Sequence, residues 1–183
     1  PGVGGVSPKL LYEDDTIQYA GMASGLRNLT GTTFYCYPAE SVHYFNFPQS
    51  VRNVSILSGA CMAMTRSLFQ ELGGFDHINT PSAHSDVDLS FKILDAGYRC
   101  VYTPYASLRH IGHQSLAANE KTERPDKKDK ADIYLLRRWM KYLGDDPYFT
   151  KPMRELLYHD SPEPFRLFTP VTQRRFGNKG DVL

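Results

Sequence analysis

The pattern of apolar and polar positions is most regular between Leu57 and Tyr102, where it predicts alternating strands and helices. In order, this stretch predicts a strand, a glycine-bearing turn, a short helix, an acidic loop, a second helix and a second strand. Each predicted helix is followed by a glycine, Gly73 or Gly97, where a helix end favours a left-handed residue. Strands that alternate with helices predict an α/β layer architecture.

Apolar runs before this stretch predict further strands and a loop. Val3–Tyr12 predicts a short buried strand, and Thr16–Gly25 predicts a strand and a turn. Residues 26–50 are rich in Tyr, Phe, Pro, Asn and Thr without a helical period, so we expect a long structured loop. Val51–Thr65 alternates imperfectly and predicts a mostly buried strand.

After Tyr102 the pattern predicts one clear helix. Residues 119–130 are charged and lack apolar anchors, which indicates a solvated or mobile loop. Asp132–Leu143 is amphipathic and is followed by Gly144 as a stop. The side chains expected on its apolar side are Ile133, Leu136, Trp139, Met140 and Leu143. Three prolines from Ser161 onward exclude long elements near the C-terminus.

The composition is that of an ordinary soluble globular domain. The 183 residues are 41% hydrophobic and 22% charged, with a formal net charge of +1. This balance implies no strong attraction to nucleic acid or to an anionic membrane, and no apolar run approaches the roughly 20 residues that span a bilayer. Cys36, Cys61 and Cys100 are an odd, widely spaced set, and Cys61 and Cys100 lie in predicted strands and are interpreted as buried free thiols. We therefore predict a reducing, cytoplasmic compartment.

Carboxylates at the start of the second predicted helix are the first candidates for chemistry. Ser85 is predicted to be the N-cap, and Asp88 then falls at the third helical position, as in an acidic capping box. Asp86 and Asp88 are separated by about 200° of helical rotation, so they point to different sides and cannot act as one pair. With Asp88 in the cap, Asp86 is left to face a cleft.

Other features have both a structural and a functional interpretation. Gly59 marks a bulge in the predicted strand, or it lets the backbone approach a ligand. Asp14-Asp15 is interpreted as a turn rather than as a metal clamp. His110 and His113 are three residues apart and can both ligate a metal, but the pattern alone is weak.

Many short motifs occur in an order that resembles bacterial family 2 glycosyltransferases over about residues 3–150. The motifs are Val6-Ser7-Pro8-Lys9-Leu10-Leu11-Tyr12, Gln18-Tyr19-Ala20-Gly21, Ser58-Gly59-Ala60-Cys61-Met62, Arg66, Phe69, Gly73-Gly74-Phe75-Asp76, Ser85-Asp86-Val87-Asp88-Leu89, Ala96-Gly97-Tyr98, Tyr102-Thr103-Pro104, His110 and Asp145-Asp146-Pro147-Tyr148. The resemblance implies a GT-A fold, in which a Rossmann-like nucleotide-sugar-binding sheet joins an acceptor-binding half. It also implies inverting transfer from a nucleotide-sugar donor to a glycan acceptor, with Mn²⁺ or Mg²⁺.

The resemblance also implies roles for particular residues. Ser58-Gly59-Ala60 matches a glycine-bearing loop on the acceptor side. Ser85-Asp86 matches the acidic motif that ends in the general base, although a serine stands here in place of the usual first acid. An acceptor hydroxyl is a poor nucleophile, so a carboxylate such as Asp86 must take its proton as it attacks the anomeric carbon. His110 matches a late histidine that reaches the metal or the diphosphate, and Ser85 and Asp88 are expected to support the site.

Part of the family pattern has no counterpart here. Family members begin with a nucleotide-binding half whose Asp-x-Asp motif supplies carboxylates to the metal, whereas Asp86-Val87-Asp88 sits in the base position. We therefore expect residues 1–150 to be the C-terminal, acceptor-side part of a catalytic domain, a partial mixed sheet flanked by helices. Residues 151–183 would be a proline-rich extension and tail. The parent would be a hexosyltransferase-type enzyme, cytoplasmic or peripheral to the inner membrane, and this chain alone would be inactive. A missing half would also leave a sheet edge prone to self-association.

Two competing hypotheses use other residues. A non-catalytic carbohydrate-binding or partner-docking module would use the aromatic side chains of the long loop, although packing of that loop onto the body is the favoured interpretation. These side chains are Tyr35, Tyr37, Tyr44, Phe45 and Phe47. A metal-binding domain would use His84, Asp86, His110 and His113, but their spacing fits no closed zinc site.

Overall fold

The structure is a computed structural model that describes residues 2–26, 29–81, 83–111, 125–159 and 166–167. Its elements are, in chain order, β1 (Val3–Leu11), β2 (Ile17–Tyr19), β3 (Met22–Ser24), β4 (Thr30–Thr32), α1 (His43–Asn46), η1 (Phe47–Gln49), β5 (Arg52–Val54), α2 (Arg66–Glu71), α3 (Ser85–Asp95), β6 (Arg99–Arg109), α5 (Pro125–Leu143), α6 (Lys151–Leu157), β7 (Tyr158–His159) and β8 (Arg166–Leu167).

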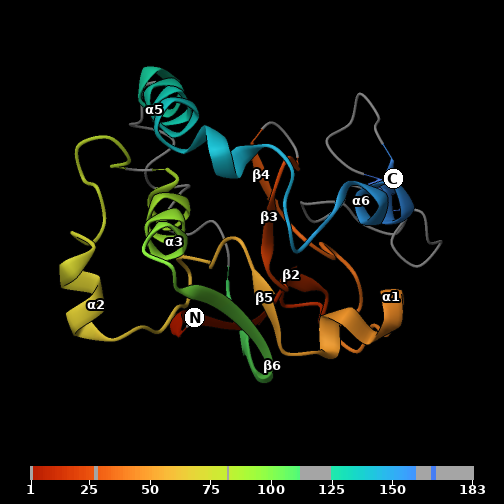
Figure 1. Ribbon diagram of the computed structural model, residues 1–183. Coiled ribbons are helices and arrows are strands. Elements are labelled where there is room, and N and C mark those ends of the chain that lie inside the picture. The colour runs from red at the N-terminus through yellow and green to blue at the C-terminus, as the bar shows by residue number, and fades with distance from the viewer. Residues whose placement is uncertain (1, 27–28, 82, 112–124, 160–165, 168–183) are drawn as a thin grey trace.

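The central sheet is mixed and has the strand order β2-β1-β6-β5. The two long strands β1 and β6 pair in parallel, whereas β2 and β5 pair with them in antiparallel fashion. In Figure 1, α2 and α3 lie to the left of these strands and α1 and α6 lie to their right. The predicted α/β class and the mixed sheet flanked by helices are confirmed.

Helix α3 packs closely on β1 because two glycines of that strand have no side chain. A Cβ atom on Gly4 would lie 2.6 Å from the Ile93 side chain of α3, and one on Gly5 would lie 3.3 Å from Ile93 and 2.6 Å from Leu57. These contacts exclude any larger residue unless the helix moves outward. The strand and the helix thereby build the main core, in which Leu10, Ile93 and Cys100 are buried.

The long loop of residues 26–50 is held on the sheet by polar contacts to its backbone. The Lys9 ammonium donates to the carbonyl of Ala39 at 3.0 Å, and the Tyr102 hydroxyl donates to the carbonyl of Pro48 at 2.7 Å. Burial lowers the pKa of Lys9. The predicted structured loop is confirmed, although it also contains β4 and the short helical turns α1 and η1.

The prediction of one long strand over Val51–Thr65 is wrong. Only Arg52–Val54 forms a strand, and later residues make single bridges, Met22 to Ile56 and Val6 to Ala63. Cys61 consequently lies in a half-buried bend rather than in a strand, whereas Cys100 is buried in β6 as expected. All three cysteines are free thiols.

The helix predicted over Asp132–Leu143 exists, but it starts earlier and turns a different face to the core. It begins at Pro125, within the stretch that was predicted to be a loop. From Lys130 onward, where the side chains of this helix are described, the buried ones are Ala131, Leu135, Trp139 and Leu143, which recur every four residues. Ile133, Leu136 and Met140, which were predicted to be buried, are 47%, 37% and 62% exposed. The apolar residues of α5 therefore occupy two faces.

The C-terminal segment is tied to the N-terminal half through Asp146. One carboxylate oxygen accepts from the Ser24 amide at 2.8 Å, and the other accepts from Tyr148 and Phe149 at 2.8 and 3.0 Å. Met153 of α6 then lies in the main core. Of the extension and tail predicted for residues 151–183, residues 160–165 and 168–183 lie outside the described residues.

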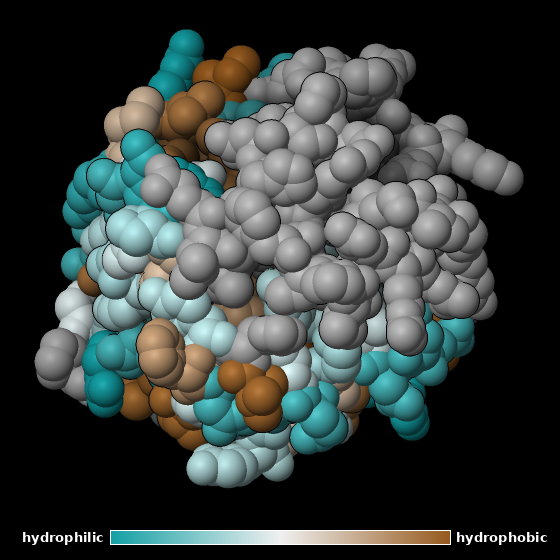
Figure 2. Space-filling model, turned by 90° about the vertical axis from the view of Figure 1, so that its right-hand side faces the viewer, coloured by the Kyte–Doolittle hydropathy of each residue, from teal (hydrophilic) through white to brown (hydrophobic). Residues whose placement is uncertain are grey.

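In the view of Figure 2, the described surface carries no single dominant apolar face, and apolar residues form small patches among hydrophilic ones.

At the β2 edge of the sheet, the amide of Ile17 donates to the carbonyl of Tyr37 at 2.7 Å, so the long loop lines β2. Among the described helices, none is both long and apolar enough to cross a membrane.

Candidate functional site

The start of α3 carries the predicted acidic motif, but its capping differs from the prediction. The N-cap is His84, in a left-handed conformation with φ of 63°, and Ser85 is the first helical residue. Asp88 is therefore one position too far along to complete a capping box. The predicted cap by Ser85 and Asp88 is wrong, because the left-handed turn at His84 starts the helix one residue earlier.

Asp86 lies against the glycine-bearing loop. Its Oδ2 atom accepts a hydrogen bond from the Gly59 amide at 2.9 Å, and its Oδ1 atom accepts from the Val87 amide at 2.9 Å. A Cβ atom on Gly59 would lie 3.2 Å from both the Cβ and the Oδ2 of Asp86. Gly59 thus lets the backbone approach the carboxylate closely, and it lies in a turn rather than at a strand bulge. The structure brings together two predicted site elements that are 27 residues apart.

The loop itself is fixed to the sheet and to α3 by serine side chains. The Ser58 amide donates to Ser7 of β1 at 3.3 Å, and the Ala60 amide donates to the Ser58 hydroxyl at 3.3 Å. Ser90 of α3 accepts from the Leu57 amide at 3.0 Å. Gly59 and Ala60 remain exposed, so the loop presents backbone to solvent beside the Asp86 carboxylate.

Asp88 is a structural residue of the α3–α5 contact. Its side chain is fully buried, its Oδ2 atom forms an ion pair with Lys92 at 2.7 Å, and its Oδ1 atom accepts from the indole of Trp139 at 2.7 Å. The Tyr134 hydroxyl also donates to Oδ1, at 3.2 Å. Burial and the nearby Asp88 charge raise the pKa of Tyr134 to about 12. Asp86 and Asp88 thus point to different sides of the helix, as predicted.

His110 lies where the parallel strands β1 and β6 end. Its amide donates to the carbonyl of Leu11 at 2.9 Å, and its Nδ1 atom lies 2.7 Å from Oε1 of Gln18. The Gln18 amide nitrogen donates to the His110 carbonyl at 3.3 Å. This contact orients the Gln18 amide so that its oxygen faces the imidazole, and Nδ1 must carry the proton that it donates. In the neutral ring Nε2 is then the basic nitrogen.

Asp86 and His110 are anchored at different levels of the sheet. The Asp86 loop is fixed at Ser7, whereas His110 bonds Leu11, and these β1 positions are roughly 13 Å apart along a strand. Within the described ranges, no three His, Cys, Asp or Glu side chains gather closely enough to hold a metal ion.

The residues of the proposed metal-binding domain are not brought together. His84 pairs with Asp132 of α5 at 2.7 Å, and His113 lies outside the described residues. Asp14 accepts from the amide and the hydroxyl of Thr16, at 3.2 and 2.7 Å, which confirms the predicted turn.

The aromatic side chains of the long loop divide into two groups. Tyr35 and Tyr37 are buried in the core and Tyr44 and Phe47 pack against it, as the packing interpretation predicted. Phe45 instead is 92% exposed.

Two residues of structural importance near the site were missed by sequence reasoning. Gln18 orients His110, and Asp132 pairs with His84, the residue at the N-cap position of α3. Gln18 belongs to one of the motifs that carried the family resemblance, so the sequence marked its position. The sequence did not indicate that its side chain would bond His110. Asp132 gave no signal, because a carboxylate on a charged helix is ordinarily solvent-exposed.

Comparison with known proteins decides the family. Residues 18–139 match the family model described as glycosyltransferase-like family 2, which is more than half of the chain. The chain belongs to glycosyltransferase family 2. The matched range contains the Gly59 loop, Asp86 and His110, so the predicted family 2 membership is confirmed.

Curated relatives of this family 2 chain are much longer than it. The uncharacterized protein y4gI of Sinorhizobium fredii is 35% identical over 149 residues, covering 81% of this chain and 16% of the relative. The O-antigen biosynthesis protein RfbC of Myxococcus xanthus is 33% identical over 154 residues, covering 81% of this chain and 11% of the relative. The N-acetylglucosaminyl-diphospho-decaprenol L-rhamnosyltransferase of Mycobacterium tuberculosis is 41% identical over 61 residues, 33% of this chain and 20% of the enzyme. The chain spans less than a fifth of the length of the first two of these relatives.

Proposed function

We propose that this chain is part of an inverting glycosyltransferase that moves a hexosyl group from a nucleotide-sugar donor to a glycan acceptor, with Asp86 as the general base. The observation that carries the proposal is the Asp86 carboxylate, fixed against the exposed Gly59 loop at the start of α3. Membership of family 2 supplies the reaction class.

The chemical step requires one proton acceptor. The acceptor hydroxyl gives its proton to Asp86 while its oxygen bonds the anomeric carbon, and the bond from that carbon to the nucleoside diphosphate breaks. Each Asp86 oxygen accepts one backbone hydrogen bond, which leaves lone-pair capacity for the incoming proton. The two amides also fix the direction of the carboxylate, which favours a defined attack geometry.

The names of the relatives support a glycan acceptor in cell-surface polysaccharide assembly. One is an O-antigen biosynthesis protein and another transfers rhamnose to a diphospho-decaprenol-linked sugar. We propose the same broad acceptor class here.

We also propose that the complete protein uses Mn²⁺ or Mg²⁺, but the described residues do not form a metal centre by themselves. His110 would offer one nitrogen, Nε2, because its Nδ1 is held by Gln18. The transfer of the acceptor proton to Asp86 does not depend on the ion. Loss of turnover after chelation, restored by Mn²⁺ or Mg²⁺, would support this part, whereas full activity after chelation would oppose it.

The chain's share of its relatives' length supports a further proposal, that turnover needs residues beyond these 183. We also propose self-association through the β5 edge of the sheet, because the loop already lines the β2 edge. Product formation by the isolated chain would contradict the first statement, and a monomer in light scattering would contradict the second.

The decisive experiment replaces Asp86 by Asn in the complete, active protein. Asn keeps an oxygen that can accept from Gly59 but loses basicity, so kcat should fall by about 10²- to 10⁴-fold while donor binding is retained. Asp95→Asn is the matched control, since Asp95 lies in the same helix and pairs with Lys141 and Tyr142 at the surface. Unchanged kcat in Asp86→Asn would overturn the assignment.

A saccharide-binding role remains the second candidate because of the turn that presents Phe45. Tyr44, Phe45 and Asn46 all have positive φ, between 50° and 61°. Three consecutive left-handed residues without glycine are costly, and such strain is often retained where it serves binding. Glycan binding that is lost in Phe45→Ala and kept in Asp86→Asn would favour this candidate.

A further inference from the structure

His84 is the residue through which the chain enters α3. It is the N-cap of that helix and has a left-handed backbone, with φ of 63° and ψ of 14°. Its carbonyl accepts a hydrogen bond from the Asp88 amide at 2.9 Å, so its conformation sets the direction of the first turn. A left-handed conformation is costly for a residue that has a side chain, and it persists where neighbouring contacts hold it.

The His84 side chain is used for a contact with another helix. Its imidazole makes no hydrogen bond to the amides of the first turn, although an N-cap side chain ordinarily does. Its Nε2 atom instead lies 2.7 Å from Oδ1 of Asp132 on α5. The two side chains are only 20% and 31% exposed, so water screens this contact less than it screens a pair on the open surface. The contact therefore joins the start of α3 to α5.

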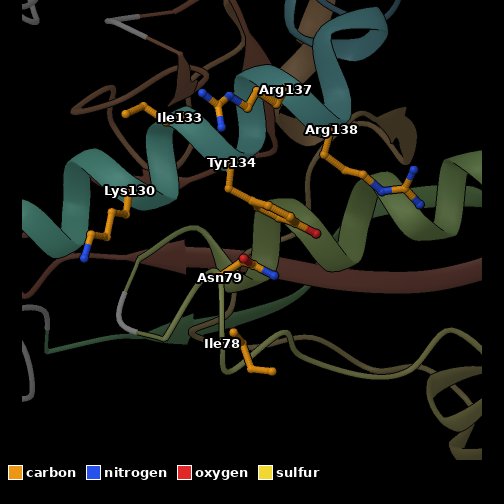
Figure 3. Close-up of a pocket in the computed structure, with 7 residues that line it drawn as sticks. All are labelled: Ile78, Asn79, Lys130, Ile133, Tyr134, Arg137 and Arg138. Carbon is orange, nitrogen blue, oxygen red and sulfur yellow. The ribbon is translucent and has the colours of Figure 1, made fainter.

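The loop that precedes α3 is not packed tightly against α5 along its whole length. Ile78 and Asn79 of this loop and several α5 side chains line a hollow of about 630 Å³. Figure 3 shows one of them, Tyr134, pointing from α5 toward Asn79 and α3. Because empty space replaces side-chain packing at this place, the loop depends more on directed polar contacts such as that of His84.

A second contact with α5 holds the other end of the same turn. Asp88, four residues after His84, accepts from the Trp139 indole at 2.7 Å and from the Tyr134 hydroxyl at 3.2 Å. In Figure 1, α5 lies above α3. The first turn of α3 is consequently fixed to α5 at both ends, which restricts how it can shift or rotate.

Asp86 is the middle residue of this turn. Its carboxylate accepts from the Gly59 amide at 2.9 Å, on a different side of the helix from Asp88. A Cβ atom on Gly59 would lie only 3.2 Å from Asp86, so the turn and the Gly59 loop fit closely. A small shift of the turn would therefore move the carboxylate relative to this loop.

We propose that His84 and Asp132 are positioning residues for the general base: their contact holds the left-handed turn that presents the Asp86 carboxylate at the Gly59 loop. Neither residue is assigned a contact with the reacting groups. The inference rests on the proposed function, because the contact matters for turnover only if Asp86 is the base. A misplaced base slows the chemical step more than it weakens donor binding.

The test replaces each residue by Ala, singly and together, in the complete, active protein. His84→Ala and Asp132→Ala should each lower kcat by about tenfold, while the KM for the donor stays within about twofold. Because the two residues act through one contact, the double variant should be no slower than the slower single variant. Asp132→Asn keeps an oxygen that can accept from Nε2, so it should recover most of the kcat lost in Asp132→Ala.

The 183-residue chain provides a readout that does not depend on turnover. Hydrogen exchange of the Gly59 amide should be faster by about threefold or more in Asp132→Ala, because the bond to Asp86 weakens. Lys141→Ala is the matched control, since Lys141 of α5 pairs with Asp95 at the opposite end of α3. It removes a contact between the same two helices and should change neither kcat nor the exchange of the Gly59 amide.

Three results would overturn the inference: a wild-type kcat in Asp132→Ala, unchanged Gly59 exchange in that variant, or equal losses in Lys141→Ala. Asp86→Asn separates this failure from a failure of the proposed function. A low kcat in Asp86→Asn beside a wild-type kcat in Asp132→Ala would refute the positioning role alone. An unchanged kcat in Asp86→Asn would refute the proposed function itself.

Discussion

At the residue scale, the candidate site depends on the absence of a side chain at position 59. Gly59→Ala would place a methyl group 3.2 Å from the Asp86 Cβ and Oδ2 atoms, which is closer than ordinary packing allows. The carboxylate must shift, so the hydrogen bond from the residue 59 amide weakens. We expect faster hydrogen exchange of that amide by about fivefold, equivalent to about 1 kcal/mol.

Gly144→Ala is the control for this substitution, because a Cβ atom there meets nothing within 4 Å. It should leave the exchange of the Gly59 amide unchanged. Equal exchange in the wild-type and Gly59→Ala proteins would show that the contact does not hold Asp86.

A second prediction at this scale concerns the protonation of His110. Because Gln18 presents its oxygen to Nδ1, the neutral ring should carry its proton on Nδ1 and leave Nε2 free. Nitrogen chemical shifts from long-range proton–nitrogen correlation spectra distinguish the two tautomers. Gln18→Met removes the acceptor, so the Nε2-protonated form should increase. A wild-type ring protonated on Nε2 would contradict the prediction.

At the scale of elements, α5 shows what the sequence pattern left ambiguous. Two apolar series interleave in this helix, Leu135 with Trp139 and Ile133 with Leu136 and Met140, and either fits a helical period. The contact with α3 determines which series is buried. Asp88 on α3 accepts a hydrogen bond from the Trp139 indole, so Leu135 and Trp139 face the core. Leu135→Ala should therefore cost about 2–5 kcal/mol in urea unfolding, as for a buried leucine.

Leu136→Ala is the neighbouring control and should cost less than about 1 kcal/mol, since that side chain is partly exposed. If Leu136→Ala cost more than Leu135→Ala, the buried face would be the one that the sequence pattern predicted.

Short-range patterns predicted most other elements correctly, including the strand Val3–Leu11 and the left-handed glycines at the ends of α2 and α3, Gly73 and Gly97.

The errors in the sequence-based prediction came from contacts that join distant parts of the chain. The predicted strand over Val51–Thr65 does not form as one element, because Ile56 bridges to Met22 and Ala63 bridges to Val6. At the site, resemblance selected Asp86 and the Gly59 loop, which do meet. It gave no hint that Asp88 would be buried against α5, because that role depends on a residue 51 positions away.

At the scale of the whole molecule, one buried carboxylate joins the two ends of the described chain. Asp146 accepts three backbone hydrogen bonds, from Ser24, Tyr148 and Phe149, and precedes α6, whose Met153 fills the main core. Asp146→Ala would leave buried donors without partners, and we expect a loss of about 2–4 kcal/mol in the free energy of unfolding. Hydrogen exchange at Ser24 should increase with it.

The adjacent Asp145 provides the control, because its side chain is exposed. Asp145→Ala should change the free energy of unfolding by no more than about 0.5 kcal/mol. If both variants lost the same stability, the turn rather than the link to Ser24 would be the stabilising feature. If neither did, α6 would dock through Met153 and the hydrogen bond from Arg154 to the Gly25 carbonyl alone. A large loss confined to Asp146→Ala would instead mean that the segment after residue 144 completes the fold of this family 2 domain.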